Sequence, residues 1–364
     1  MLKRRDFLVA GASIGTTTLL AGSPAFAQGA SASTSQAPAA PASATAAQTS
    51  WNDGLAHPIP YSPQLGTGKA RGLVLGGGGI YLASWMAGYF RTLKANGIDI
   101  ANADIAVGTS AGSLVGAVLL GGRLEKFAAE LEVLGKNPAL FAKLIPAIPP
   151  NPSQLRARSI ADSATEATPE VIQSIGRSAM AARNPAGPSD YFAHVQELLG
   201  ETGWPSPNLH TTANDCYTGQ RLVVSHDSGI PISHACAASS SLPGSMGPTW
   251  LDNRLCMDGG ICQTSTHSDV VAGVKKALII SLSDGGEDAV KVGLRTSGLP
   301  NTLQQEVKTL ESQGTQTILK VVGLMPGVTY VDSIMDPKWI MPCLENGHER
   351  ALADVKELQA FWNA

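Results

Sequence analysis

A Gly-x-Ser-x-Gly motif between two apolar runs constrains the fold of this chain more than any other feature. A short apolar run at residues 105–107 ends in Gly-Thr-Ser-Ala-Gly (108–112), and a second apolar run follows at once. This order predicts a strand, a sharp turn and a helix, with the Ser110 hydroxyl presented above the sheet from a strained backbone. Gly108 and Gly112 suit such a turn because strand and helix approach too closely for side chains. The pentapeptide alone also fits a glycine-rich turn that enters a buried helix.

The same strand-then-helix order precedes the motif, which favours an α/β fold. Residues 72–75 have the pattern of a short buried strand, and apolar residues recur at helical spacing from 81 to 95. A strand at 104–107 and a helix at 111–120 then follow. Two strand–helix units at this spacing imply a βαβ unit and a parallel sheet.

The N-terminal residues have the pattern of an export signal. Lys-Arg-Arg-Asp-Phe-Leu (3–8) is a twin-arginine motif, a mildly apolar stretch follows at 9–21, and Ala-Phe-Ala (25–27) is a small-x-small cleavage site. We therefore expect residues 1–27 to be a signal peptide that the twin-arginine export machinery of a bacterium reads. The mature protein is then expected to be periplasmic or secreted. No cysteine lies at the cleavage site, so a lipoprotein anchor is not expected.

Composition divides the rest of the chain. Residues 28–50 are Ala, Ser, Thr, Gln, Pro and Gly without a charge, which predicts a disordered tether, and residues up to 70 form an N-terminal arm. A catalytic domain is expected over 71–364. Within it, 135–207 is rich in proline and short helical patterns, which indicates a helical insertion that is either a candidate lid or a surface excursion. Its apolar residues are candidates for contact with lipid: Leu140, Phe141, Leu144, Ile145 and Ile148.

Charge and cysteine content exclude several classes of function. A formal net charge of −3 argues against a nucleic acid partner. The cysteines have no zinc-binding spacing and an odd count, so we interpret them mainly as small core residues, with Cys256–Cys262 as a conceivable bridge. The carboxylates show no metal-ligand spacing, and neither a metal nor an organic cofactor is expected. The five cysteines are Cys216, Cys236, Cys256, Cys262 and Cys343.

Two further segments carry residues suited to chemistry. Four successive glycines, 76–79, end the first strand and allow several backbone N–H groups to turn toward one substrate oxygen. The run lacks the Lys-Ser/Thr of a phosphate-binding P-loop, so an oxyanion hole is favoured. Met-Asp-Gly-Gly (257–260) places the carboxylate of Asp258 at a strand end, beside glycines that permit close approach of another loop.

Together, these three segments resemble the marks of the patatin-like phospholipase family, which are a glycine-rich loop, a Gly-x-Ser-x-Gly elbow and an Asp-Gly-Gly/Ala acid. Residues 76–88 are similar to the opening helix of an actinobacterial-type subgroup, and 237–244 to the family's segment before the acid. The resemblance covers about residues 71–282. It implies a three-layer α/β fold, with a mainly parallel central sheet and helices on both faces.

The resemblance also implies a serine lipid acyl hydrolase that cleaves carboxylic esters through a Ser–Asp dyad and an acyl-enzyme. Ser110 is then the nucleophile and Asp258 the base, and Asp258 must be desolvated because a free Asp, with a pKa of about 3.9, is a poor base. The expected oxyanion donors are the N–H groups of Gly77, Gly78, Gly79 and Ala111. Supporting roles fall to Gly76, Gly108, Gly112, Gly259 and Gly260.

Two alternatives stay open at this point. One is a short-chain carboxylesterase with a Ser-Asp-His triad, for which His267 follows the acid closely, while His226, His234 and His348 lie elsewhere. The other is a non-catalytic exported lipid-binding protein. One departure bears on the substrate: Tyr81-Leu82 stands where many family members carry Arg or Lys and then Gly. Without that cation, the resemblance leaves neutral esters open as substrates beside phospholipids.

Overall fold

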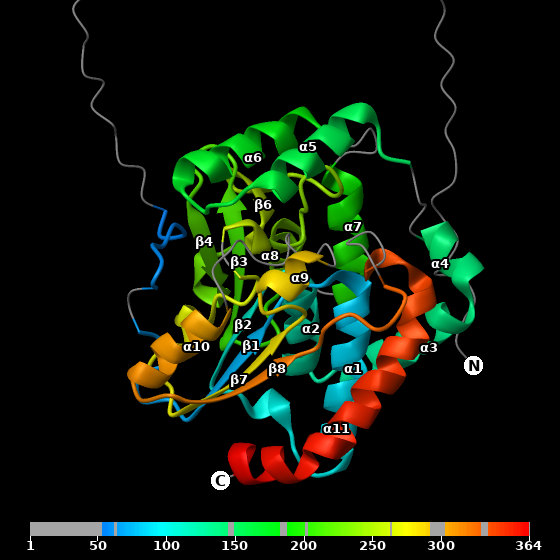
Figure 1. Cartoon of the computed structure of the whole chain (residues 1–364), viewed down its shortest axis with the longest axis vertical. Helices are drawn as coiled ribbons and strands as arrows, with labels where there is room; N and C mark the ends of the chain where they lie inside the picture. The colour runs from blue at the N-terminus through cyan, green and yellow to red at the C-terminus, as the bar shows by residue number, and fades with distance from the viewer. Residues whose placement is uncertain are drawn as a thin grey trace, which may run out of the picture. The chain divides into compact units, whose positions relative to one another are not determined.

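The computed structural model describes residues 53–61, 64–144, 149–182, 188–200, 203–262, 264–291, 303–328 and 334–363 (Figure 1). The predicted signal peptide and tether lie outside the described residues, as do Ile145 and Ile148 of the insertion.

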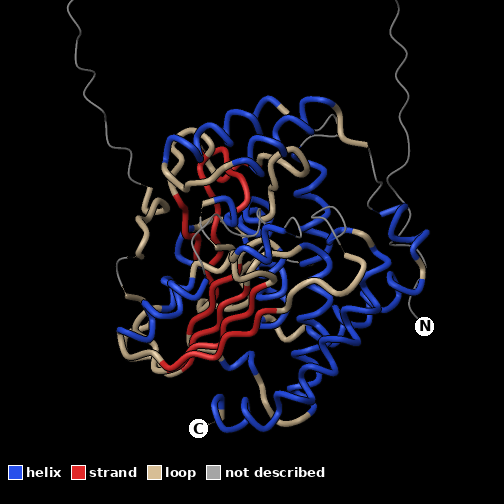
Figure 2. The backbone as a smooth tube through the Cα atoms, viewed as in Figure 1, coloured by secondary structure: helices blue, strands red, loops and turns tan. Residues whose placement is uncertain are grey.

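Eight strands form one mixed sheet at the centre of the described chain (Figure 2). Their order is β5-β6-β3-β2-β1-β7-β8, with β4 paired to β3. Strands β3, β2, β1, β7 and β8 are parallel to one another, whereas β4, β5 and β6 join antiparallel. The strands are β1 Arg71–Leu75, β2 Ile105–Gly108, β3 Leu209–Asp215, β4 Arg221–Ser225, β5 Thr249–Leu251, β6 Arg254–Asp258, β7 Lys276–Ser281 and β8 Gln316–Val321.

Helices cover both faces of this sheet, which confirms the three-layer α/β fold. Along β1, Leu73 and Leu75 pack on one face with residues of α1, α2 and α11, whereas Val74 packs on the other with residues of α10. This alternation is the two-residue period of a strand buried on both sides. The helices are α1 Gly79–Ala95, α2 Ala111–Leu120, α3 Leu124–Lys136, α4 Pro138–Leu144, α5 Pro152–Ser163, α6 Pro169–Ala181, α7 Pro188–Leu199, α8 Ile232–Ser239, α9 Glu287–Lys291, α10 Leu303–Ser312 and α11 Ile340–Trp362.

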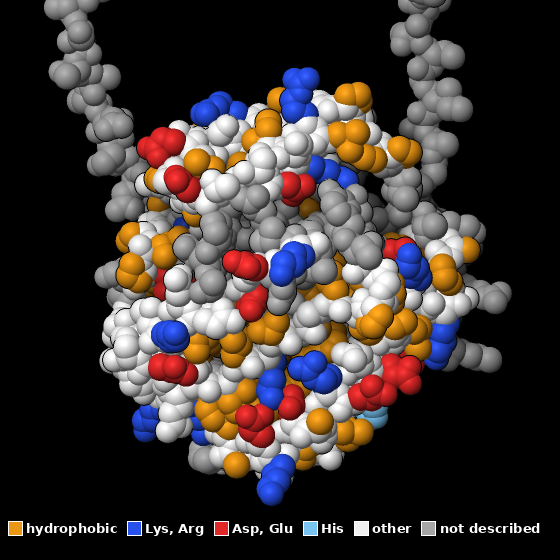
Figure 3. Space-filling model, viewed as in Figure 1, with side chains coloured by type: hydrophobic (Ala, Val, Ile, Leu, Met, Phe, Trp, Pro, Cys, Tyr) orange, Lys and Arg blue, Asp and Glu red, His pale blue; other side chains and the backbone are white. Residues whose placement is uncertain are grey.

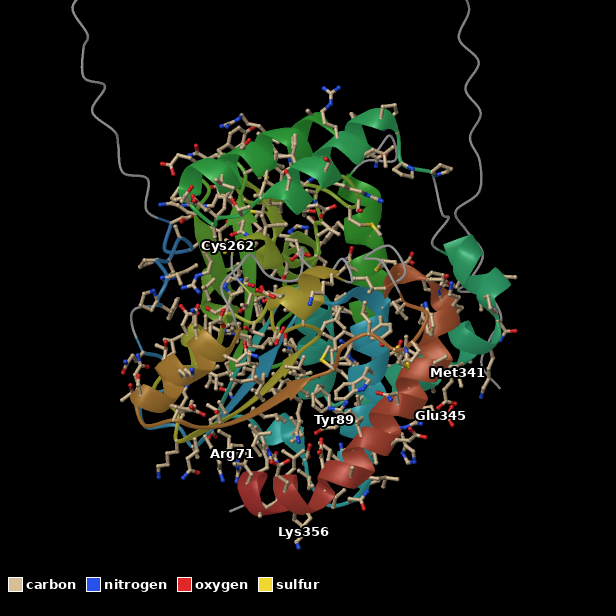
Figure 4. The ribbon with its side chains drawn as sticks, viewed as in Figure 1. Arg71, Tyr89, Cys262, Met341, Glu345 and Lys356 are labelled. Carbon is tan, nitrogen blue, oxygen red and sulfur yellow. The ribbon has the colours of Figure 1, made fainter. Side chains whose placement is uncertain are left out.

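Helix α1, which starts in the glycine run, is held along its length by α11 (Figure 1). A side chain on Gly88 would meet the carbonyl oxygen of Leu344 at 2.1 Å, so the two backbones touch where no side chain intervenes. Tyr89 lies beside α11 (Figure 4), and its hydroxyl is 2.7 Å from Oδ2 of Asp354. The C-terminal helix therefore fixes the helix that carries the glycine run.

The N-terminal arm packs against the sheet. The N–H of Val223 donates to the carbonyl of Leu55, and the N–H of His57 donates to that of Arg221, each at 2.9 Å. Asp53 forms a salt bridge of 2.7 Å with Arg254, whose side chain is buried at the start of β6. Residues 55–57 thus lie beside β4.

The predicted insertion is helical, and part of it is built into the body of the protein. On α6, a side chain on Gly176 would meet the carbonyl oxygen of Cys216 at 2.5 Å, which shows how closely this helix approaches the β3–β4 turn. Ile175 of α6 packs in one cluster with Met257 and Ile261. Phe141 is 6% exposed, so its interpretation as a lipid-facing residue is wrong, whereas Leu140 is 40% exposed.

All five cysteines are buried and free, so they are core residues and the conceivable bridge between Cys256 and Cys262 is not formed. Cys262 lies in the upper part of the view in Figure 4, within the same cluster as Met257. On the face drawn in Figure 3, acidic and basic side chains are interspersed with apolar ones. Among the helices of the described residues, none combines the length and the apolar character that crossing a bilayer requires.

Candidate active site

Ser110 occupies the predicted elbow between β2 and α2. Its backbone has φ 53° and ψ −121°, a left-handed conformation that costs a non-glycine residue free energy. The flanking glycines explain why the turn can form. A side chain on Gly108 would meet the carbonyl oxygen of Gly112 at 2.4 Å, and one on Gly112 would meet that of Leu75 at 2.0 Å. Both positions therefore exclude any larger residue.

Neighbouring hydroxyls hold the elbow in this conformation. The N–H of Ser110 donates to Oγ of Ser239 at 2.9 Å, and Oγ of Ser113 donates back to the carbonyl of Ser110 at 2.7 Å. The hydroxyls of Thr109 and Thr212 are buried and 2.7 Å apart. Because these contacts come from α2, β3 and α8, the strained turn is fixed from three sides.

Asp258 ends β6 in a dry environment. Its side chain is 5% exposed, and Oδ1 accepts a hydrogen bond of 2.8 Å from the N–H of Gly260. Burial raises the pKa of Asp258 to about 6, and the hydrogen bonds from Gly260 and from the side chain of Ser110 lower it by less. The effect of the Ser110 side chain on this pKa indicates that Ser110 lies close to Asp258.

The sheet explains how two residues so far apart in the sequence meet. Strands β2 and β6 both pair with β3, with Gly108 opposite Thr211 and Asp258 opposite Ala213. Because β2 runs parallel to β3 and β6 runs antiparallel to it, their carboxyl ends converge on adjacent positions of β3. Asn214 secures this junction, since its Nδ2 donates to the carbonyl of Asp258 at 2.6 Å.

The glycine loop, residues 76–79, lies beside Ser110. A side chain on Gly77 would meet Cβ of Ser110 at 3.0 Å. The N–H of Gly76 donates to the carbonyl of Ile280 at 2.8 Å. Among the described residues, no acceptor pairs with the four N–H groups that the sequence analysis selected, those of Gly77, Gly78, Gly79 and Ala111.

His267, the candidate for a triad, is engaged elsewhere. It is fully buried, its Nε2 is 2.8 Å from the carbonyl oxygen of Gly259, and its Nδ1 is 3.3 Å from Nη1 of Arg221. Burial and then the charge of Arg221 lower the pKa of His267 to about 4, so the ring is neutral near pH 7. Nε2 then donates to Gly259, and Nδ1 accepts from Arg221. Both ring nitrogens are used in holding the acid loop.

Three other histidines also have partners away from Ser110. His226 is exposed, and its Nδ1 lies 3.1 Å from Oδ1 of Asp227. The ring of His234 packs against that of Phe192, with 4.0 Å between the ring centroids. Nδ1 of His348 is 2.8 Å from the hydroxyl of Thr92 on α1.

Tyr81, the departure from the family pattern, is buried and hydrogen-bonded to the segment that follows β8. Its side chain is 1% exposed, and its hydroxyl accepts from the N–H of Met325 at 2.8 Å and donates to the carbonyl of Gly323 at 3.3 Å. Burial raises the pKa of Tyr81 to about 12, so the side chain is uncharged. It provides structural hydrogen bonds in place of a cation.

Sequence reasoning missed the residues that support the site. Three polar residues bond to groups around the elbow and the acid, namely Ser239, Thr212 and Asn214. None of them belongs to a motif that would have predicted this role. Ser239 falls within the 237–244 segment noted above, which was the one available signal.

Fold and site define an α/β protein with a serine elbow, a glycine-rich loop and a buried acid. The profile of the family described as "Patatin-like phospholipase" matches residues 73–269, and the chain belongs to this family. It is accordingly a carboxylic ester hydrolase of the lipid-hydrolase type.

The solved structures with some similarity to this chain include those of VipD and ExoU. VipD from Legionella pneumophila is 13% identical, with a TM-score of 0.38, over 79% of this chain and 67% of VipD. The type III effector protein ExoU is 16% identical, with a TM-score of 0.28, over 78% of this chain and 54% of ExoU. The match to the structure of the ExoU–SpcU complex of Pseudomonas aeruginosa is 17% identical, with a TM-score of 0.34, over 82% of this chain and 52% of the matched chain. This chain thus spans about half the length of the ExoU chains. No curated protein sequence matches it.

Proposed function

We propose that this protein is a serine lipid acyl hydrolase that acts through a dyad of Ser110 and Asp258. The observation that carries the proposal is the closeness of the Ser110 side chain to the buried carboxyl group of Asp258, whose pKa burial raises to about 6. A carboxylate with this pKa is a far better base than a free aspartate and is still ionised near pH 7.

The proposed reaction proceeds in two steps. Oγ of Ser110 attacks the acyl carbonyl carbon while Asp258 takes the hydroxyl proton, and the C–O bond to the alcohol then breaks as Asp258 protonates the leaving oxygen. A water molecule, deprotonated by Asp258, then attacks the acyl carbonyl carbon, and the bond to Oγ of Ser110 breaks as Asp258 returns the proton to Oγ and the acid is released. In both steps, the N–H groups of the glycine loop and Ala111 bind the oxyanion, and each donor contributes roughly 3–4 kcal/mol to the barrier reduction.

Reaction with a fluorophosphonate tests this proposal. The purified protein should be labelled covalently, and Ser110→Ala should abolish both labelling and hydrolysis of p-nitrophenyl esters. Ser312→Ala is a matched control, because Ser312 ends α10 and its hydroxyl is exposed. Absence of labelling in the wild-type protein would instead favour the lipid-binding alternative.

For the substrate, we propose lipid esters without a strict requirement for a phosphate group. Tyr81 is uncharged and its hydroxyl is bonded to the backbone of Gly323 and Met325, so it does not neutralise a phosphate at the glycine loop. Phospholipid vesicles and neutral acylglycerol emulsions, matched in acyl chain, should be hydrolysed at rates within about tenfold of each other, a difference of about 1.4 kcal/mol. Hydrolysis of the phospholipid alone would contradict this part of the proposal.

We further propose export by the twin-arginine route, on the basis of the motif at residues 3–8. The five free, buried cysteines are compatible with folding in a reducing compartment before transport. In a bacterial host, replacing Arg4 and Arg5 by Lys should retain the protein in the cytoplasm, whereas Lys3→Gln should not. An unchanged distribution of the double variant would contradict this route.

A further inference from the structure

One short segment, residues 264–268, lies against both halves of the candidate site. Ser265 is 2% exposed, and its Cβ is 3.5 Å from the position that a side chain on Gly77 would fill. The same Cβ is 3.3 Å from the corresponding position on Gly260, which follows the acid. Ser265 thus packs between the glycine loop and the acid loop, where neither neighbour has a side chain to adjust.

The carboxylate of Glu306, on α10, fixes this segment from the outside. One of its oxygens accepts the hydroxyl of Thr264, and the other lies 2.8 Å from Oγ1 of Thr266 and 2.9 Å from Oγ of Ser268. Thr264 and Thr266 are themselves linked at 2.7 Å. Burial raises the pKa of Glu306, and the three hydroxyls lower it by smaller amounts.

The segment has a second anchor on the acid side. His267 adopts a left-handed backbone with φ 47°, so the chain turns sharply between the hydroxyls that bind Glu306. Its ring donates to the carbonyl of Gly259. The 264–268 segment therefore connects α10 on one side to the residue after Asp258 on the other.

We propose that Glu306 is a positioning residue that sets the distance between the glycine loop and Asp258 through the 264–268 segment. This inference rests on the proposed function of Ser110 and Asp258. In that reaction, the oxyanion donors and the base must act on one ester group at once, and a displacement of about 1 Å can cost on the order of 100-fold in rate. Among the described residues, Glu306 bonds the hydroxyls of the 264–268 segment and not Ser110 or Asp258, so we expect it to act through the position of the two loops.

Rates per reactive serine provide the test. Fluorophosphonate titration counts the reactive sites in each preparation, and kcat for a p-nitrophenyl ester is divided by that number. Glu306→Ala should lower kcat per titrated site by about 10- to 100-fold, with KM within about twofold of wild type. A merely structural role would reduce the number of titrated sites and the melting temperature but leave the rate per site unchanged.

Two further variants sharpen this comparison. Glu306→Gln keeps the length and an acceptor oxygen, and its amide can donate to hydroxyls that rotate, so kcat per site should recover to within about threefold of wild type. Glu311→Ala is the matched control, because Glu311 lies on the same helix and contacts the exposed Thr317. It should leave kcat unchanged.

The outcomes separate this inference from the proposed function. A rate per site in Glu306→Ala within twofold of wild type overturns the positioning role, as does a Gln variant as slow as the Ala variant. If Glu306→Ala does not fold, Thr266→Val removes one of the hydroxyls that bind Glu306 with little change in shape. A lower kcat per titrated site in this variant supports the positioning role, and a rate within twofold of wild type overturns it. A wild-type protein that is neither labelled nor active would refute the proposed function itself, and the inference would fall with it.

Discussion

The side chain of Ser110 lies close enough to Asp258 to lower the pKa of its carboxyl group, although one residue follows β2 and the other ends β6, two strands that each pair with β3. The serine is held in a strained turn and the aspartate is almost fully buried. Each feature raises the free energy of the folded state, and together they place a nucleophile beside a base. Backbone strain and buried ionisable groups, which both cost folding free energy, are typical of functional sites.

Removal of the Asp258 charge should abolish most activity while the fold persists. In Asp258→Asn, the amide can still accept the N–H of Gly260, but it cannot take a proton from Ser110. We expect kcat to fall by about 10²- to 10⁴-fold, the range for loss of a general base. Asp252→Asn is a matched control because Asp252 is an exposed acid in the β5–β6 hairpin. Ester hydrolysis assays on both variants make the comparison.

The pH dependence of the rate should follow Asp258. Burial raises its pKa to about 6, and only the ionised form can accept the proton of Ser110. kcat/KM should therefore rise tenfold per pH unit below about pH 6 and level off above it. A plateau that extends down to about pH 4, the range of a free aspartate, would contradict the role of burial.

The raised pKa of Asp258 also predicts that the folded protein loses stability over the pH range in which the activity rises. Because the folded-state pKa of Asp258 is about 6 and the unfolded value is 3.8, the folded state binds the proton more tightly. Its contribution to stability is full below about pH 4 and is lost as the pH rises through about 6. The difference in the free energy of unfolding between Asp258→Asn and wild type should therefore shift in favour of the variant by on the order of 3 kcal/mol from about pH 4 to pH 8. Urea unfolding at both pH values measures this gain.

A methyl group on the glycine loop should displace Ser110. The added Cβ in Gly77→Ala would lie 3.0 Å from Cβ of Ser110, closer than ordinary contact. We expect kcat to fall by about 10- to 100-fold, with a smaller effect on KM. Gly203→Ala adds the same group where nothing lies within 4 Å and should be neutral. Equal rates for the two variants would mean that the loop adjusts freely.

Replacement of His267 should leave most of the activity. In His267→Gln, the amide can donate to the carbonyl of Gly259 as Nε2 of the histidine does. We expect kcat within about threefold of wild type, far from the loss of about 10²- to 10⁴-fold that removal of a general base produces. An inactive His267→Gln beside an active Asp258→Asn would establish a histidine-based mechanism instead.

Much of the fold follows from local sequence patterns. The helix at Ala111–Leu120 has the predicted bounds, and the β3–β4 hairpin forms where alternating residues flank Thr218-Gly219. These elements have strong apolar periodicity or distinct turn residues, which single-sequence reasoning detects. Strand β5, by contrast, has three residues, one of them an exposed Trp250, and offers no period to detect.

The site was predictable in its parts but not in its connections. Glycine patterns identified the elbow and the glycine loop because each requires backbone contact that only glycine permits. The antiparallel entry of β6 beside β2 depends on pairing across the sheet, which no local pattern encodes. The same is true of Glu306, a single glutamate on an ordinary amphipathic helix.

Helix α6, which contains none of the proposed site residues, contributes to the apolar surroundings of Asp258. Its Ile175 packs with Met257 and Ile261, which flank Asp258 on either side, so the insertion contributes to the apolar surroundings of the acid. Substitutions on this helix can change how dry those surroundings are while every motif residue stays the same. Evolution therefore has a route for adapting the enzyme to acidic or alkaline habitats through the insertion, and laboratory selection for an altered pH optimum should find its first mutations there.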